Sequence, residues 1–305
     1  MHHVSSLETI YRDYSPLGVQ FYYIYKHLQH PELDGYIQSF TLEERLMHIQ
    51  EARRTLGSEI PWISDSMSND LKHALGNSPN SEFVIDPEGK VAIRRAWSQP
   101  ELLRQDLERL VGPVENPTQV SDLNLKVEPP PKVAASGVVP RVEVPGIMRA
   151  VRIKPQSSEL PFYAKLRAEV DRNFFGSGEG VLYLGFHVDP IYRVHWNNLV
   201  NPLKFEIKAP EGITVSPSQG EGPQVAVPSD IDPREFLLDV KKQKETSQPL
   251  ELAVRYFACN DEEGWCIPVS QKYSIYLESD SDLGQNLRRS WSWSSPEGPP
   301  PPQSR

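Results

Sequence analysis

The chain has little cysteine. Among its 305 residues only Cys259 and Cys266 carry thiols, which excludes the framework of several disulfides that staples small secreted domains. Long apolar runs are missing as well, since no stretch approaches the ~18 apolar residues of a membrane-spanning helix. The residues after Met1 follow the pattern of an amphipathic helix and not that of a signal peptide. We therefore expect no membrane span and no signal peptide within this chain.

Basic residues are outnumbered, with 32 Lys and Arg against 41 Asp and Glu and a formal net charge of −9. This balance argues against nucleic acid and against an anionic membrane surface as partners. We find no Gly-rich phosphate loop and no Ser/His/Asp catalytic set. Asp261 to Glu263 lack the alternate ligand spacing of a calcium loop and indicate a solvated acidic turn. We expect no cofactor and no metal, because no common zinc spacing is found among His27, His30, His48, His73, His187 and His195.

Both cysteines lie in the stretch Pro249 to Glu278. On each side of them apolar and polar residues alternate with period two, which predicts two half-buried strands. Asn260 to Gly264 between them is rich in turn-forming residues. The stretch therefore predicts a β-hairpin with one thiol at each foot of its loop. Directly opposed residues of such a pair lie about 4.5–5.5 Å apart, within the range that a disulfide bridges.

Two interpretations of this cysteine pair are open. In the first, the pair is a structural staple, although closing so short a loop stabilises a fold by only about 2–3 kcal/mol. In the second, the pair exchanges electrons with a partner by thiol–disulfide exchange. His195 and Trp196 are candidates to flank the cysteines, and a plain core or edge role suits them equally well.

The spacing Tyr256-x-x-Cys259, six residues, then Cys266-x-Pro268 resembles the redox hairpin of the N-terminal immunoglobulin-like domain of the disulfide-reductant transporter DsbD. The resemblance covers residues 177–280. It implies an all-β immunoglobulin-like sandwich over 151–282, with Cys259 and Cys266 as the catalytic pair. It also implies a thiol-disulfide partner protein and an extracytoplasmic location, in the periplasm or secreted. Oligomeric state is left open.

Residues 1–112 alternate helical and extended patterns in the order α-β-α-β-α-β-β-α, which predicts an α/β thioredoxin-like domain lacking its first strand. The clearest helix covers 41–56, with Thr41 and Glu44 as a capping box and Gly57 as its end. The other expected elements are helices at 4–14 and 69–75, strands at 20–25 and 60–64, a hairpin at 83–95, and a helix capped by Ser98.

Residues 21–36, the stretch Ile60 to Asp65, and Pro79-x-x-x-Phe83 to Asp86 resemble the iodothyronine deiodinase-like redoxins. In that family the nucleophile, cysteine or selenocysteine, follows the first strand. Matching Ser6 to Tyr11 with the family's first helix places that position before Met1. The resemblance therefore implies that this domain is inactive as given.

Proline marks the remaining boundaries. Residues 113–150, with Pro129 to Pro131, are expected to be a linker, and the Ser-, Trp- and Pro-rich tail 283–305 is expected to be disordered. Within the second domain we expect one short helix at 162–172 and strands from Gly180 onward. Two function classes follow. One is a thiol-disulfide redox protein, and the other is a non-catalytic binding or scaffold protein with a structural disulfide.

Overall fold

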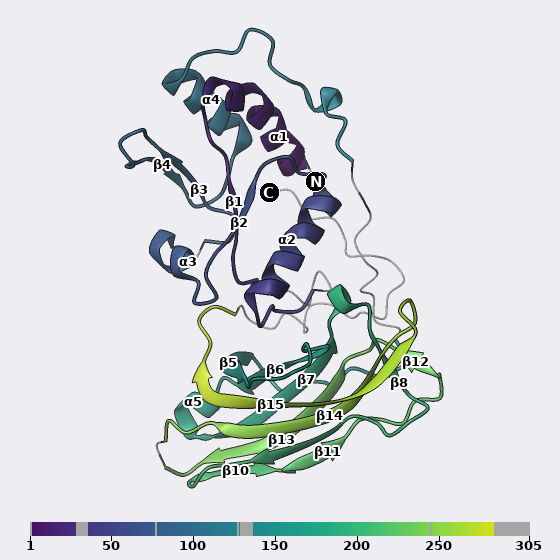
Figure 1. Ribbon diagram of the computed structural model, residues 1–305. Helices are drawn as coiled ribbons and strands as arrows, with labels where there is room; N and C mark the ends of the chain where they lie inside the picture. The colour runs from purple at the N-terminus through teal and green to yellow at the C-terminus, as the bar shows by residue number, and fades with distance from the viewer. Residues whose placement is uncertain are drawn as a thin grey trace. The chain divides into compact units, whose positions relative to one another are not determined.

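The computed structural model describes residues 2–28, 36–76, 78–126, 128, 137–244 and 246–283 (Figure 1). The chain divides into two compact units, one formed by residues 1–27 and 39–131 and the other by 28–38 and 132–305. His30, Pro129 to Pro131 and the tail from residue 284 lie outside the described residues. Over the described ranges, no helix is long and apolar enough to cross a membrane.

The first unit is a set of helices with two small sheets. Its elements are α1 (His2–Tyr14), η1 (Ser15–Leu17), β1 (Tyr23–Tyr25), α2 (Leu42–Leu56), β2 (Trp62–Ser64), α3 (Asp70–Leu75), β3 (Glu82–Ile85), β4 (Val91–Arg95), α4 (Pro100–Leu110) and η3 (Val120–Asp122). The capping box of α2 is confirmed, because the Thr41 side chain accepts from the Glu44 amide and Gly57 ends the helix in the left-handed region. Ser98 does not cap α4. The N-cap is Gln99, and the Ser98 hydroxyl donates to Glu82 instead.

Helices α1 and α4 form the main apolar core of this unit. Ile10 and Tyr14 of α1 pack with Leu103 and Leu107 of α4, and all four side chains are buried. Each pair is spaced by four residues, so its members lie on the same face of their helix. This spacing is the reason that the sequence predicts both helices correctly.

The predicted thioredoxin-like domain is wrong, although most of its elements exist. A thioredoxin-like fold needs one central sheet. Here β1 and β2 form a parallel pair in which Tyr23 lies opposite Trp62, and β3 and β4 form a separate antiparallel pair. Among the described residues no strand joins the two pairs. The order of helices and strands along a chain does not fix which strands pair.

The second unit is built from strands. Its elements are β5 (Met148–Pro155), β6 (Ala164–Asp171), α5 (Phe174–Ser177), β7 (Glu179–Val188), η4 (Pro190–Tyr192), β8 (His195–Asn197), β9 (Lys204–Lys208), β10 (Ile213–Ser216), β11 (Gln219–Glu221), β12 (Ser229–Asp230), β13 (Arg234–Lys242), β14 (Leu250–Asn260) and β15 (Trp265–Ser279). Nine of them follow one hydrogen-bonded path in the order β10-β13-β7-β6-β5-β15-β14-β8-β12. This path forms a nearly closed, barrel-like sheet.

The predicted immunoglobulin-like sandwich is therefore wrong as well, and strand β5 is the reason. Its first residues pair with β6, where Ala150 lies opposite Glu169. Its last residues pair with β15, where Ile153 lies opposite Ile275. One strand thus belongs to both halves of the sheet, so the halves are joined and not stacked as two separate layers.

The helix expected at 162–172 is strand β6 instead. Ala164, Leu166, Ala168 and Val170 are buried on one face, and the charged residues between them are buried on the other. Charged side chains are rarely buried unless they are paired. The Lys165 ammonium binds the Asp189 carboxylate here, which allows a strand with charged residues to be covered on both sides.

The chain at residues 137–142, within the predicted linker, is bound to the strands of the second unit. The buried Asp232 carboxylate accepts three backbone N–H groups, from Gly137 at 2.9 Å, Val138 at 2.6 Å and Val139 at 2.9 Å. The Arg141 guanidinium donates twice to Glu235, at 2.7 and 2.8 Å. Two carboxylates close together in the chain therefore hold this segment.

Replacing Asp232 by Asn should release the segment. The amide keeps one acceptor oxygen but loses the charge and the second oxygen, and a hydrogen bond to a charged group contributes about 1.5–3 kcal/mol. We expect backbone amides of residues 137–139 to exchange with deuterium roughly 10–100-fold faster, measured by mass spectrometry. Asp239→Asn, at an exposed position of the following strand β13, is the control and should leave this exchange unchanged. Equal exchange in both variants would contradict the role of Asp232.

Candidate functional site

The hairpin predicted for the two cysteines is confirmed. Strands β14 and β15 pair antiparallel, Cys259 lies directly opposite Cys266, and the two residues form a disulfide with their Cα atoms 4.0 Å apart. The turn between them is closed by the Gly264 amide, which donates to the Asn260 carbonyl at 2.9 Å. Gly264 has φ +72°, a conformation that favours glycine.

The disulfide lies on the face of the hairpin that points away from the core. Side chains of β14 alternate between faces, and the core face carries the buried Leu250, Leu252, Val254, Tyr256 and Ala258. Cys259 follows Ala258 and therefore points to the opposite face. The two cysteines differ in accessibility, because Cys259 is only 4% exposed whereas Cys266 belongs to the exposed residues.

Strand β8 runs along the other side of β14 and brings His195 next to the pair. His195 lies opposite Cys259, so Cys266, Cys259 and His195 form one row across three strands. The His195 Nδ1 atom lies 2.9 Å from the Trp196 carbonyl oxygen. Because a carbonyl only accepts, Nδ1 is assigned as the ring nitrogen that carries hydrogen and donates. Its Nε2 atom lies 3.1 Å from Asp261 Oδ1, so a doubly protonated ring forms an ion pair there.

Asn197, two residues further along β8, contacts a sulfur atom directly. Its Nδ2 donates to Cys266 Sγ at 3.3 Å. Its Oδ1 accepts from the Leu199 amide at 2.9 Å. Among the described side chains, that of Asn197 is the one that donates a hydrogen bond to a sulfur of the disulfide.

The acidic turn after Asn260 is exposed, as expected, and its carboxylates also contact neighbouring side chains. Glu262 pairs with Arg193, Asp261 faces His195, and Glu263 Oε2 accepts from Trp265 Nε1 at 2.5 Å. Glu262 and Glu263 therefore each have a partner. The Asn260 side chain adds to the turn, since its Oδ1 accepts from the Glu263 amide at 3.0 Å. The turn is held by these contacts in addition to the disulfide.

The other residues of the sequence motif lie in different surroundings. Tyr256 is buried on the core face, where its hydroxyl donates to Gln271 at 2.8 Å and accepts from the Ala164 amide at 3.0 Å. Burial raises the pKa of the Tyr256 hydroxyl far above its usual value. Pro268 is exposed opposite Phe257, on the face that carries the disulfide. The motif thus joins a core tyrosine to an outward-facing cysteine pair.

Of the sequence-predicted candidates, the structure brings Cys259, Cys266 and His195 together. Trp196 points to the core, where its ring packs edge-on against Tyr256 at 5.6 Å and its Nε1 donates to the Asp232 carbonyl at 2.7 Å. Sequence reasoning missed Asn197. The available signal was its spacing, because residues i and i+2 of a strand share a face and Asn197 follows His195 by two.

A buried polar network holds β8 in this position. Arg234 donates to both oxygens of Asp230, at 2.9 and 2.7 Å, and Asn198 donates to Asp230 at 2.7 Å. The Arg234 guanidinium also lies over the Trp196 ring at 5.1 Å. Burial alone would raise the pKa of Asp230, but the hydrogen bonds from Arg234 and Asn198 outweigh burial and lower it. The strand that carries His195 and Asn197 therefore depends on a charged pair inside the fold.

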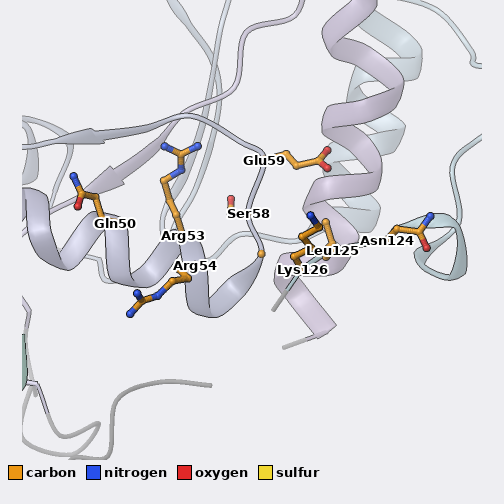
Figure 2. A pocket seen from close by; sticks show the side chains of 9 residues that line it. Gln50, Arg53, Arg54, Ser58, Glu59, Asn124, Leu125 and Lys126 are labelled. Carbon is orange, nitrogen blue, oxygen red and sulfur yellow. The ribbon is translucent and has the colours of Figure 1, made fainter. Parts of the chain in front are cut away.

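A pocket of 470 Å³ lies in the first unit, at the C-terminal end of α2 (Figure 2). Arg53, Arg54 and Lys126 contribute positive charge to it. Figure 2 shows the side chains of Arg53 and Arg54 pointing to opposite sides of the helix end, and Arg54 is paired with Glu51 and Glu128. These cations do not converge on one ligand.

The comparisons with known proteins give no family. No model of a known protein family matches the chain, and no curated protein matches it. Over the part of the chain that the structure describes, no group of three or more His, Cys, Asp or Glu side chains could hold a metal ion. The candidate site is therefore defined by its own geometry: the Cys259–Cys266 disulfide with Asn197 and His195 beside it.

Substituting Asp230 by Asn should destabilise the second unit by about 3–5 kcal/mol, because the buried Arg234 then lacks its carboxylate partner. Urea unfolding at neutral pH measures this loss. The control is Glu221→Gln in the exposed Lys204–Glu221 pair, which should cost less than about 1 kcal/mol. Similar losses in the two variants would contradict the importance of the buried pair.

The Asp230 pair should also give stability a characteristic pH dependence. The folded protein lowers the pKa of Asp230 below the ordinary value of 3.8. Its contribution is therefore fully present above that value and is lost as the pH falls through the lowered pKa. The stability gap between the parent protein and Asp230→Asn should accordingly narrow below about pH 3.8. A gap that widens in acid would contradict this assignment.

Proposed function

We propose that the protein is a thiol-disulfide redox protein that exchanges electrons with a partner through Cys259 and Cys266. The observation that carries the proposal is the position of the disulfide on the outward face of the sheet, with Cys266 exposed and Cys259 buried. An incoming thiolate must approach a sulfur in line with the bond that breaks. Exposure favours Cys266 as the sulfur that is attacked.

Reduction of the disulfide by a partner takes place in two steps. A thiolate of a partner dithiol attacks Cys266 Sγ, the Cys259–Cys266 bond breaks, and its electron pair leaves on Cys259 Sγ, which takes a proton from water. The second partner thiolate then attacks the partner sulfur of the mixed disulfide and releases Cys266 as a thiolate. The partner dithiol is oxidised to a disulfide, and this protein gains two electrons. The reverse sequence oxidises the pair, and the partner's potential sets the direction.

Two further observations support exchange over a purely structural staple. The bridged residues are seven apart in sequence, so loop closure contributes only about 2–3 kcal/mol. The hairpin turn is already held by Asn260 and Gly264. The sequence resemblance of this hairpin to the redox hairpin of the DsbD-type domain points the same way. Because disulfides persist in oxidising compartments, we place the protein outside the cytoplasm.

Equilibration with glutathione or dithiothreitol buffers, followed by alkylation of free thiols, tests the proposal. We expect the pair to be reduced in the folded protein, with a midpoint above about −300 mV. Far-UV and near-UV circular dichroism of the same samples should show an unchanged fold. A pair that is reduced only as the second unit unfolds would favour the scaffold protein with a structural disulfide.

The single-cysteine variants identify the attacked sulfur. Cys259→Ser leaves the exposed Cys266 thiol, which should form a mixed disulfide with a chromogenic aryl disulfide rapidly in the native state. Cys266→Ser leaves the buried Cys259 thiol, which should react at least about tenfold more slowly, because approach to a buried sulfur requires local opening. Equal rates would contradict the assignment of Cys266.

A further inference from the structure

We infer that Asn197 is a thiolate-stabilising residue whose side-chain amide supports the reactive form of Cys266. The inference rests on the proposed exchange and adds a residue that the cysteine pattern does not contain. It follows from three features of the site: the fixed orientation of the amide, the distance to the sulfur, and the difference between a disulfide sulfur and a thiolate as hydrogen-bond acceptors.

The orientation of the Asn197 amide is decided by its neighbours. An asparagine side chain has one acceptor oxygen and one donor nitrogen, and their placement is assigned from the hydrogen bonds around them. Here the Leu199 backbone N–H lies 2.9 Å from Oδ1 and can only donate, so this atom must be the oxygen. The NH₂ group is thereby left facing Cys266 Sγ at 3.3 Å. The donor is aimed at the sulfur before any reaction takes place.

The backbone of Asn197 is fixed as well. It is the last residue of β8 and pairs with Ser229 of β12, while the preceding Trp196 is anchored in the core. The next residue, Asn198, donates to the buried Asp230 at 2.7 Å and to the Val227 carbonyl at 2.9 Å. A donor held on both sides loses little conformational entropy when it stabilises a new charge.

The hydrogen bond from Asn197 becomes stronger when the disulfide is reduced. A disulfide sulfur is a weak acceptor, whereas a thiolate carries a full negative charge, and hydrogen bonds to ionised groups are about twice as strong as neutral ones. The Asn197 amide therefore favours the reduced pair with Cys266 ionised. A larger thiolate fraction at neutral pH speeds the attack of Cys266 on a partner disulfide, since the thiolate is the nucleophile.

Asn197 also has a structural role that must be separated from this one. By accepting from the Leu199 amide, its side chain closes a local turn of the kind that Asn and Asp favour. The substitution Asn197→Asp separates the two roles. The new carboxylate would retain an oxygen for Leu199 and so preserve the turn. It would also replace the NH₂ donor by an oxygen facing the sulfur and add a negative charge there. The neutral variant Asn197→Ser, whose hydroxyl can still accept from the Leu199 amide, is therefore measured beside it.

The experiment measures the thiol pKa of Cys266 from the pH dependence of its alkylation by iodoacetamide, in the full chain with Cys259→Ser. We expect the neutral variant Asn197→Ser to raise this pKa and to slow alkylation at about pH 7 by roughly threefold or more, and Asn197→Asp to raise it by about one unit or more and to slow alkylation by roughly tenfold. The fold should be unchanged by circular dichroism. Ser270→Asp is the matched control, because Ser270 is exposed on the same face of β15, four residues from Cys266.

The outcomes distinguish this inference from the proposed function. If Asn197→Ser leaves the pKa and the alkylation rate of Cys266 unchanged, any shift in Asn197→Asp comes from its added charge, Asn197 has only its structural role, and the inference is overturned. If the parent disulfide nevertheless exchanges in the folded state, the proposed function stands without Asn197. If the parent disulfide cannot be reduced while the unit is folded, the proposed function fails, and the inference fails with it.

Discussion

The register of β14 against β15 and β8 is the constraint on which the candidate site depends. Since side chains alternate along a strand, a slip of one residue would turn Cys259 toward the core and Ala258 outward. The core residues prevent this slip, above all Tyr256, whose hydroxyl bridges Gln271 of β15 and the Ala164 amide of β6. The meeting of Cys266, Cys259 and His195 on one face is a consequence of how the opposite face packs.

Local patterns in the sequence predict the parts of the structure whose contacts are made between residues close together in the chain. The capping box at Thr41 and Glu44 is made within one helical turn, and it is present in α2. The cysteine hairpin likewise depends on alternation over adjacent residues and on a turn rich in Asn, Asp and Gly. The disulfide follows from it, because opposed positions on a hairpin bring two thiols to bonding distance.

The predictions that are wrong concern the pairing of segments that are distant in the sequence. Strand β5 joins both halves of the sheet. No pattern in its residues, Met148–Pro155, indicates that its first part pairs with β6 and its last part with β15. The pairing of β1 with β2 is of the same kind. In β6 the apolar residues alternate as in a strand, but the intervening charges suggest a solvated helix. Their burial is possible only because partners such as Asp189 come from outside the strand.

The attachment of residues 137–139 to Asp232 has a mechanical consequence. Asp232 lies between Asp230 and Arg234, the charged pair that supports the strand carrying Asn197, and its backbone N–H donates to Asp230 at 2.8 Å. Tension applied to the chain at Gly137 would therefore reach this pair and Trp196 of β8 through Asp232, and through β8 the hairpin. A pull on that anchor would disturb the surroundings of the sulfur atoms while the disulfide itself stays bonded. Force on the chain and the environment of Cys266 are thus connected through one short stretch, residues 230–234.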